Sequence, residues 1–484
     1  MVSGFITGMA MQPLFLGFFA WFGLIPLLKK LIDNHNLKQD LISAFVWGIT
    51  YHLTVIHWMA LNIGTTPVIA VGTLIFSVIF LTMNPMLIVF IWSLSKKQLW
   101  IFPFVWVSVE YIRSFGVMGF PWISLANTQS DYLILIQNVE ITGIYGISFW
   151  LLLVNTAGFI FFRDREMKSL KMFIPVIIFP WINGFFLLPD IPDTEEDHSN
   201  EISVASIQPN IDLLQKWKKG SAEENFQNIL KMCEPAINDN VDLLIWPESS
   251  ISAYPLKRDK KYLEMIQSSL NGHETKLLTG IPHYEREDTG INYYNAAVLI
   301  DEKNVSEVYK KIQLVPGAEY IPMSGMIPGI KKLNFGQANF THGVDPLVYQ
   351  INNSKFGTVI CFESTFPQLV RKFVQNGAEF LVIVVNDGWY ERAPEPQQHA
   401  KQSIFRAIET RRWVIRCANT GISQVVDPAG NIRHQLLLKK AGSMRAVITP
   451  ENVITFYTHF GNIFAGLILL CTFSIVLYST VKRS

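Results

Sequence analysis

The sequence predicts a multi-pass helical membrane region joined to an α/β domain that lies outside the membrane. Of the 484 residues, 50% are hydrophobic and only 16% are charged, a balance too apolar for an ordinary soluble protein of this length. Apolar stretches of membrane-crossing length fill residues 1–188 and return near the C-terminus. Between them the apolar runs shrink to strand length and charged residues reappear, which marks a separate domain.

Each predicted membrane helix is an apolar stretch near the length of about 20 residues that a helix needs to cross a bilayer. Residues 1–12, which precede Pro13, form a candidate short first helix. The longer candidates are residues 14–28, 41–63, 68–94, 99–112, 143–162, 173–188 and 463–477.

Lys and Arg in the short loops predict the orientation, because such loops favour the cytoplasmic side. The positive loops surround Lys29, Lys96, Arg163 and Lys482, and counting crossings puts all of them on one side. The large domain is then on the opposite face, which in a bacterium is the periplasmic face of the inner membrane. The expected domains are 1–188 (N-terminal transmembrane), 189–455 (periplasmic) and 456–484 (C-terminal transmembrane helix and cytoplasmic tail).

Two charged residues fall inside a predicted membrane helix. Glu110 and Arg113 are three positions apart, so they share a helix face. Charges at that depth are costly unless they are paired. A structural ion pair is therefore preferred over the functional alternative, in which Arg113 binds a phospholipid head group.

The extramembrane region alternates strand-like and helix-like segments, which favours a layered α/β domain. Its β-rich runs start at Ile202, Val241, Lys276, Asn295, Phe356, Phe380 and Arg412. Amphipathic patterns typical of helices cover residues 222–237, 258–270, 366–376 and 397–411.

Charge and cysteine content exclude several classes of function. The net charge is +1 and no basic stripe occurs, so nucleic acid is not an expected partner. The four cysteines are scattered, which predicts no disulfide framework. Neither Cys-x-x-Cys nor His-Glu-x-x-His occurs, so no metal or cofactor is expected. Cys361 is then either a small core residue or a nucleophile.

Three predicted strands end in reactive groups: "LLIWPESS" carries Glu248, "VYKKIQLVPGAEYIP" carries Lys311, and "GTVICFES" carries Cys361. Each has an ordinary explanation alone, as a solvated loop residue or a core thiol. Together they suit covalent catalysis, because a thiol needs a nearby base or cation to become a nucleophile at neutral pH. Glu248 would take the thiol proton, and Lys311 would stabilise the oxyanion formed on a carbonyl.

These motifs, in the order Glu, Lys, Cys and followed by "NDGWY" at 386–390, resemble the nitrilase superfamily. Within it, the chain is similar to the membrane-embedded branch, the apolipoprotein N-acyltransferases. That resemblance covers nearly the whole chain and includes "VEYIRSFGVMGFPW" at 109–122 and "TFYTHFGNIFA" at 455–465.

The resemblance implies an αββα nitrilase-like sandwich and about eight transmembrane helices. It also implies an acyltransferase that uses a membrane phospholipid to N-acylate the diacylglyceryl-cysteine at the N-terminus of an apolipoprotein. The reaction would be ping-pong through a thioester at Cys361 and would complete a triacylated lipoprotein. No cofactor is implied, and a monomer is expected.

Further site residues follow from the same resemblance. Glu319 would orient Lys311, and Glu363 would shape the pocket around the thiol. The family commonly has Phe-Gly-Glu after the proline of this motif, whereas this chain has Gly317, Ala318 and Glu319. Three aromatic residues match or neighbour positions that line the acyl or lipoprotein entrance, or else are membrane-interface anchors: Trp217, Trp389 and Tyr390.

Two other functions remain open at this stage. A membrane-tethered nitrilase-type amidase or hydrolase would use the same residues with water as the acceptor, but a soluble amide gives no reason for so many crossings. A transporter with a periplasmic binding domain would need polar or broken helices at mid-membrane, and it leaves Glu248, Lys311 and Cys361 without a role.

Overall fold

A computed structural model of the protein describes residues 1–191, 200–216, 218, 220–288, 290–321, 339–390 and 394–482. The chain forms two compact units. One comprises Met1–Leu61, Pro67–Pro189 and Thr455–Ser484, and the other comprises Asn62–Thr66 and Asp190–Ile454.

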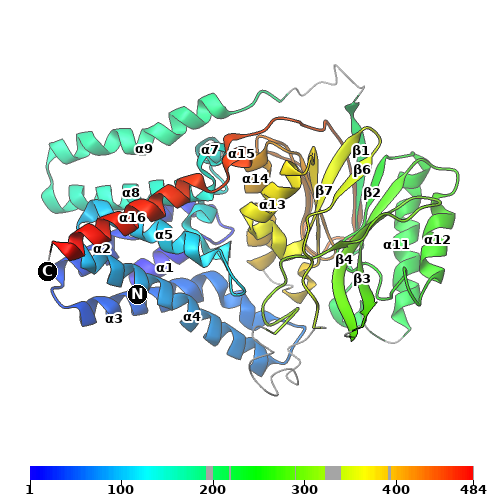
Figure 1. Ribbon diagram of the computed structural model, residues 1–484, viewed down its shortest axis with the longest axis horizontal. Helices are drawn as coiled ribbons and strands as arrows, with labels where there is room; N and C mark the ends of the chain where they lie inside the picture. Colours follow the sequence, from blue (N-terminus) through cyan, green and yellow to red (C-terminus); the bar gives the residue numbers. More distant parts are fainter. Residues whose placement is uncertain are drawn as a thin grey trace. The chain divides into compact units, whose positions relative to one another are not determined.

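The first unit is built of helices (Figure 1). Its longer helices are α1 (Val2–Met9), α2 (Ile25–Asp33), α3 (Leu37–Ile56), α4 (Pro67–Leu94), α5 (Phe102–Arg113), α8 (Ile144–Asp164), α9 (Met167–Leu187) and α16 (Ile463–Val481). Short pieces link them: η1 (Gly17–Trp21), η2 (His57–Leu61), η3 (Leu99–Ile101), η4 (Pro121–Ile123), η5 (Leu125–Gln129), α6 (Leu133–Ile136), α7 (Val139–Thr142) and α15 (Phe456–Phe460).

Four helical segments of the described chain are long and apolar enough to cross a membrane: Leu37–Leu61, Pro67–Leu94, Ile144–Asp164 and Ile463–Val481. The predicted segment 14–28 is not one helix, because η1 ends at Trp21 and α2 begins at Ile25. The segment 99–112 falls mostly in α5, which has 12 residues. The total of about eight crossings stays a prediction.

The outward faces of these helices are strongly apolar. On α4, Val68 is 82% exposed and Phe76 is 58% exposed. On α16, Leu470 and Phe473 are 61% and 65% exposed. Apolar side chains exposed all along a helix are costly in water, so these faces suit contact with lipid.

The expected ion pair between Glu110 and Arg113 is wrong. The buried Glu110 carboxylate instead accepts hydrogen bonds from Trp106 Nε1 (3.2 Å), Ser124 Oγ (2.8 Å) and the Leu125 amide (3.0 Å). The Nε and Nη2 atoms of Arg113 are buried and have no hydrogen-bond partner among the residues that the structure describes. Tertiary contacts with residues that follow η4 thus satisfy the carboxylate that helix spacing assigned to the arginine.

The second unit contains two six-stranded sheets. The first has the order β12-β1-β2-β3-β4-β5, with β12 (Gly442–Ile448), β1 (Ile202–Gln208), β2 (Leu243–Ile245), β3 (Lys276–Glu287), β4 (Gly290–Ile300) and β5 (Tyr309–Lys310). The second has the order β11-β10-β9-β8-β7-β6, with β11 (Ile432–Leu436), β10 (Ser423–Val426), β9 (Val414–Ala418), β8 (Phe380–Val385), β7 (Ser354–Ile360) and β6 (Val348–Ile351).

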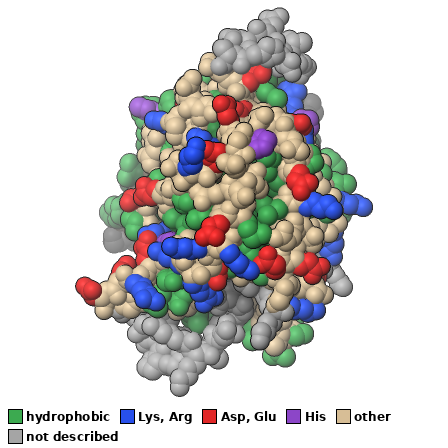
Figure 2. All heavy atoms as spheres, turned by 90° about the vertical axis from the view of Figure 1, so that its right-hand side faces the viewer, with side chains coloured by type: hydrophobic (Ala, Val, Ile, Leu, Met, Phe, Trp, Pro, Cys, Tyr) green, Lys and Arg blue, Asp and Glu red, His purple; other side chains and the backbone are tan. Residues whose placement is uncertain are grey.

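Helices cover the outer face of each sheet, which gives four layers in the order αββα (Figure 1). The first sheet is covered by α11 (Ser221–Asn238) and α12 (Lys261–Leu270), and the second by α13 (Pro367–Gln375) and α14 (Glu395–Thr410). The inner faces meet where β1 contacts β9 and β4 contacts β7. On the face shown in Figure 2, basic and acidic side chains are interspersed rather than gathered by sign.

The strand and helix predictions for this unit are confirmed at most positions. The run starting at Ile202 is β1, and the run starting at Phe380 is β8. Both are buried along nearly their whole length, as expected for the central strands of a sheet that is covered on both faces. The four amphipathic patterns correspond to α11, α12, α13 and α14, with ends that differ by at most three residues.

Candidate active site

The three predicted reactive residues follow strand ends of the two facing sheets. Glu248 follows β2 and Lys311 follows β5 in the first sheet, whereas Cys361 follows β7 in the second. Lys311 Nζ lies 3.3 Å from Glu248 Oε1. Cys361 is close enough to both for their charges to change its pKa. The structure therefore brings the three together, although they are far apart in the sequence.

A glycine makes room for the Glu248 turn. A Cβ added at Gly280 on β3 would lie 2.6 Å from the Glu248 Cα atom and 2.7 Å from the Ser249 amide nitrogen. Ser250 N also donates to the Gly280 carbonyl at 3.0 Å. The backbone of β3 thus supports the Glu248 turn at a distance that no larger residue allows.

Two carboxylates and one amide hold the lysine. Lys311 Nζ donates to Glu319 Oε1 at 2.9 Å. Asn295 Nδ2, on β4, donates to Glu248 Oε1 at 2.6 Å and to Glu319 Oε1 at 2.7 Å. The Lys311 amide donates to the Asn295 carbonyl at 2.8 Å. The predicted contact between Glu319 and Lys311 is present, and Asn295 is a central residue that the sequence analysis missed.

The charges of this network suit a thiol that must be activated. Burial lowers the pKa of Lys311, but Glu248 and Glu319 outweigh it and raise that pKa above its usual range, so the side chain stays cationic. Burial and Glu248 raise the pKa of the Cys361 thiol well above its usual range, whereas Lys311 lowers it. The resting thiol is therefore protonated, and it needs a base when it reacts.

The Cys361 backbone is in the left-handed region, with φ of 53°. This conformation is unfavourable for a residue with a side chain, and it occurs where β7 turns into the short helix η8 (Cys361–Thr365). A strained nucleophile turn must be held by its surroundings, and two buried side chains contact it.

Glu363 is the first of them, and it is fully buried. Its Oε2 accepts the amide of Ile360 at 2.8 Å, and its Oε1 accepts the amide of Ile312 at 2.7 Å. Tyr309 donates its hydroxyl hydrogen to this carboxylate, 2.8 Å from Oε1. Glu363 thus ties the end of β5, next to Lys311, to the residue before Cys361.

His399 is the second. Its Nε2 lies 3.1 Å from the Cys361 carbonyl oxygen, and its Nδ1 lies 2.8 Å from Asp387 Oδ1. No sequence signal marks His399, since it is one polar residue within an amphipathic helix. Asp387 lies two residues past the end of β8, in "NDGWY", and could have been found by the rule that found Cys361.

Ligand atoms of Cys361, Asp387 and His399 lie within 4.8 Å of one another, close enough for a metal ion. The hydrogen bonds do not fit that use. Asp387 Oδ1 is engaged by His399, and Asp387 Oδ2 accepts Arg416 Nη2 at 2.7 Å. A cation would displace these bonds and lie near the Arg416 charge, so the group is better described as a hydrogen-bonded chain.

The predicted entrance aromatics have mixed outcomes. Trp217 lies outside the described residues. Trp389 and Tyr390 are half-buried beneath the segment Asn62–Thr66, which belongs to the same compact unit. Ile63 N donates to the Trp389 carbonyl at 3.1 Å, and Asn62 Nδ2 donates to Tyr390 Oη at 3.3 Å. Their role at a substrate entrance stays a prediction.

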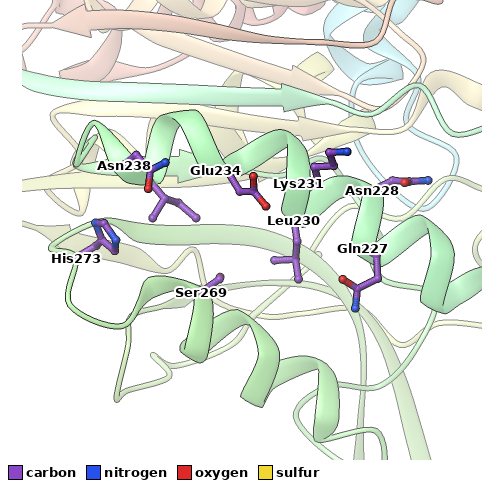
Figure 3. Close-up of a pocket in the computed structure, with 9 residues that line it drawn as sticks. Gln227, Asn228, Leu230, Lys231, Glu234, Asn238, Ser269 and His273 are labelled. Atoms are coloured by element: carbon purple, nitrogen blue, oxygen red, sulfur yellow. The ribbon is translucent and has the colours of Figure 1, made fainter.

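A surface groove lies between α11 and α12 (Figure 3). Residues of both helices line it, among them Gln227, Lys231, Glu234 and Ser269, with His273 beyond the end of α12. None of the candidate catalytic residues takes part. This groove is on the outer helical layer and is separate from the reactive group.

Comparisons with known proteins match both halves of the chain. Residues 3–157 match the family model described as the apolipoprotein N-acyltransferase N-terminal domain, and residues 203–457 match the carbon-nitrogen hydrolase model. Solved structures of the nitrilase superfamily are also similar in part. One from Saccharomyces cerevisiae is 19% identical and covers 52% of this chain and 91% of its own (TM-score 0.40). An amidase from Nesterenkonia sp. is 17% identical and covers 54% and 95% (TM-score 0.39).

Full-length relatives carry the assignment. The apolipoprotein N-acyltransferase of Geobacter metallireducens is 31% identical over 92% of this chain and 88% of its own length. Those of Chlorobaculum tepidum and Thermotoga maritima are each 28% identical, over 95% and 96% of this chain and 91% and 90% of their own lengths. The resemblance inferred from the motifs is therefore confirmed, and the chain belongs to the apolipoprotein N-acyltransferase family, acyltransferases that carry a carbon-nitrogen hydrolase domain.

Proposed function

We propose that this chain transfers an acyl group from a membrane phospholipid to the N-terminal α-amine of a diacylglyceryl-modified apolipoprotein, through a thioester at Cys361. One observation carries the proposal: a carboxylate, a buried ammonium and a thiol converge from two facing sheets. The names of the full-length relatives support the acceptor. The apolar helices support a donor that is itself a lipid.

The first half-reaction forms the acyl-enzyme. Glu248 takes the proton of the Cys361 thiol while the sulfur attacks the ester carbonyl carbon. The carbonyl oxygen becomes an oxyanion, which the Lys311 ammonium stabilises. The ester C–O bond then breaks, Glu248 returns its proton to the departing alkoxide, and a lysophospholipid leaves.

The second half-reaction uses the same groups with a different nucleophile. The α-amine of the apolipoprotein attacks the thioester carbonyl and gives up a proton to Glu248. The C–S bond breaks, and the sulfur takes the proton back as the amide forms. Glu319 and Asn295 act through the other groups, because they hold the lysine and the base in place.

The place of this reaction follows from the sequence and is part of the proposal. The chain is a multi-pass protein of the bacterial inner membrane with about eight transmembrane helices. Residues 189–455 form the catalytic domain on the periplasmic side, between the helices of 1–188 and the C-terminal helix of 456–484. The protein acts as a monomer. Trp217, Trp389 and Tyr390 line the entrance for the two lipid substrates.

Intact mass spectrometry of the purified protein tests this function. Wild type incubated with phospholipid alone should gain the mass of one fatty acyl group, and Cys361→Ser should gain none. Adding a synthetic diacylated lipopeptide with a free α-amine should discharge the adduct and yield an N-acylated peptide. If water discharges the adduct as fast as the lipopeptide does, the chain is instead a hydrolase of the nitrilase type.

A further inference from the structure

The side chain of His399 lies against the backbone of the proposed nucleophile. It is 1% exposed and projects from α14, which packs on the short helix η8. Its Nε2 is 3.1 Å from the carbonyl oxygen of Cys361 and 3.1 Å from Ser364 Oγ. The Ser364 hydroxyl itself donates to the Cys361 carbonyl at 2.8 Å. One ring nitrogen therefore bonds both ends of the first turn of η8.

The other side of the ring is held by a buried chain of charges. His399 Nδ1 is 2.8 Å from Asp387 Oδ1, and Asp387 Oδ2 accepts Arg416 Nη2 at 2.7 Å. Glu395, one turn earlier on α14, is 3.7 Å from Nδ1. Asp387 follows β8 and Arg416 lies on β9, so the ring is fixed from two strands of the sheet that also carries Cys361.

We propose that His399, held by Asp387 and Arg416, is a positioning residue whose Nε2 fixes the turn from Cys361 to Ser364 and thereby aims the thiol. This inference rests on the proposed function in one respect, that Cys361 is the nucleophile. It adds to the reaction a positioning residue that acts through the turn from Cys361 to Ser364.

The proposal holds whichever ring nitrogen of His399 carries the proton. Burial and Arg416 lower the pKa of His399, and Asp387 opposes them. A ring protonated at Nε2 donates to the Cys361 carbonyl. A ring with its single proton on Nδ1 donates to Asp387, and its Nε2 then accepts the Ser364 hydroxyl, which in that case turns away from the Cys361 carbonyl. Both arrangements tie the ring to the same turn.

The left-handed backbone conformation of Cys361 explains why the contact of His399 with this turn should affect the reaction rate. With φ of 53°, this residue leaves its strained conformation when its contacts are lost. Rotation about φ moves the thiol relative to Glu248 and Lys311, which stand on the opposite sheet. A displacement of about 1 Å at a reacting atom can cost about 100-fold in rate.

Two substitutions separate the two ring nitrogens. In His399→Gln, the amide group reaches the position of Nε2 and can donate or accept there, but the bond to Asp387 is lost. In His399→Asn, the amide group reaches the position of Nδ1 and the contact with the turn is lost. A positioning role through Cys361 predicts that Gln rescues and Asn does not.

The readout is the acylation rate of the full-length protein by p-nitrophenyl butyrate, with iodoacetamide alkylation of the thiol as a second, less geometry-dependent reaction. We expect His399→Asn to slow acylation at saturating ester by about 100-fold and alkylation by much less. We expect His399→Gln to stay within about 10-fold of wild type. The ester concentration for half-maximal rate should barely change, since no contact with the ester is removed.

Several outcomes would overturn the inference: acylation of His399→Asn at the wild-type rate, equal losses in both variants, or equal losses in both reactions. Thermal unfolding of each variant checks folding. If His399→Asn does not fold, Ser364→Ala decides, because it removes only a hydroxyl that bonds the same carbonyl. It should slow acylation about fivefold, in line with one hydrogen bond, and a wild-type rate refutes the inference.

This design separates the inference from the proposed function. The ester tests the reactivity of the thiol without a lipid substrate. If the wild type reacts with the ester but not with phospholipid, the proposed donor is refuted, and the His399 variants still test the role of His399. A wild type whose Cys361→Ser form reacts equally well with the ester refutes both.

Discussion

Asn295 offers the sharpest test of the catalytic network, because one amide nitrogen bonds both carboxylates. Its Nδ2 is 2.6 Å from Glu248 Oε1 and 2.7 Å from Glu319 Oε1. Two substitutions with the same branched shape change this in graded steps. Asn295→Asp replaces the donor with a carboxyl group, and Asn295→Leu removes all polar atoms.

The magnitudes follow from the geometry. An ionised carboxylate 2.6 to 2.7 Å from two others is repelled by on the order of 6 kcal/mol from each at an effective dielectric constant of about 20. The new carboxyl group in Asn295→Asp therefore keeps its proton at neutral pH and donates one hydrogen bond in place of two. A hydrogen bond to a charged acceptor is worth about 1.5–3 kcal/mol, so the rate should fall about 10- to 100-fold.

Asn295→Leu loses both bonds, about 3–6 kcal/mol, and should slow acylation by a factor of at least about 100. The assay is the time course of adduct formation with phospholipid by intact mass spectrometry, with thermal unfolding as the check on folding. Asn292→Asp on the same strand, β4, is the matched control and should leave the rate unchanged. Full activity of a folded Asn295→Leu variant, or a rate for Asn295→Asp below that of Asn295→Leu, would refute this reasoning.

Two further predictions concern packing and protonation. Gly280→Ala should slow acylation at least about tenfold and destabilise the protein by about 1–3 kcal/mol, because the new Cβ would lie 2.6 Å from the Glu248 Cα atom. The control is Gly466→Ala, whose new Cβ would have no atom within 4 Å. Equal effects of the two substitutions would contradict this packing argument. Burial raises the pKa of Glu363 from 4.5 to about 7, so the folded state retains a proton that the unfolded state releases between these values. The free energy of unfolding should therefore fall by about 3 kcal/mol as the pH rises through this interval, a slope that urea denaturation in detergent should show for wild type and not for Glu363→Gln.

Much of the candidate site could be predicted because its residues follow recognisable strands. The apolar runs before Glu248 and Cys361 correspond to β2 and β7; Glu248 lies three residues past the end of β2, and Cys361 directly follows β7. Strand ends at one edge of a layered domain are close in space even when they are distant in sequence. Local pattern and reactive residue type were therefore enough to identify Glu248, Lys311 and Cys361 as one group.

The supporting residues could not be predicted in the same way, because their roles depend on register between elements. Asn295 faces the carboxylates only because Ala296 of β4 pairs with Lys310 of β5, which fixes where Lys311 begins. For Glu110, in contrast, the sequence predicted a contact that the structure does not contain. Its spacing from Arg113 predicted a pair, but backbone and side-chain donors of Ser124 and Leu125 take the carboxylate. Helix spacing says which residues share a face, and tertiary contacts decide what they bind.

The hydrogen bonds of Glu363 and His399 both restrain the backbone around Cys361. Glu363 bonds the amide of Ile360, just before the nucleophile, and His399 bonds the carbonyl of Cys361 itself. The backbone is thus held by different side chains at the Ile360 amide, one residue before Cys361, and at the Cys361 carbonyl; one of these side chains is linked to the end of β5 and the other to β8 and β9. Contacts before and after a left-handed residue oppose its relaxation to a more favourable conformation. These contacts keep the thiol in one orientation, as the proposed ping-pong transfer through one sulfur atom requires while its two lipid substrates bind in turn.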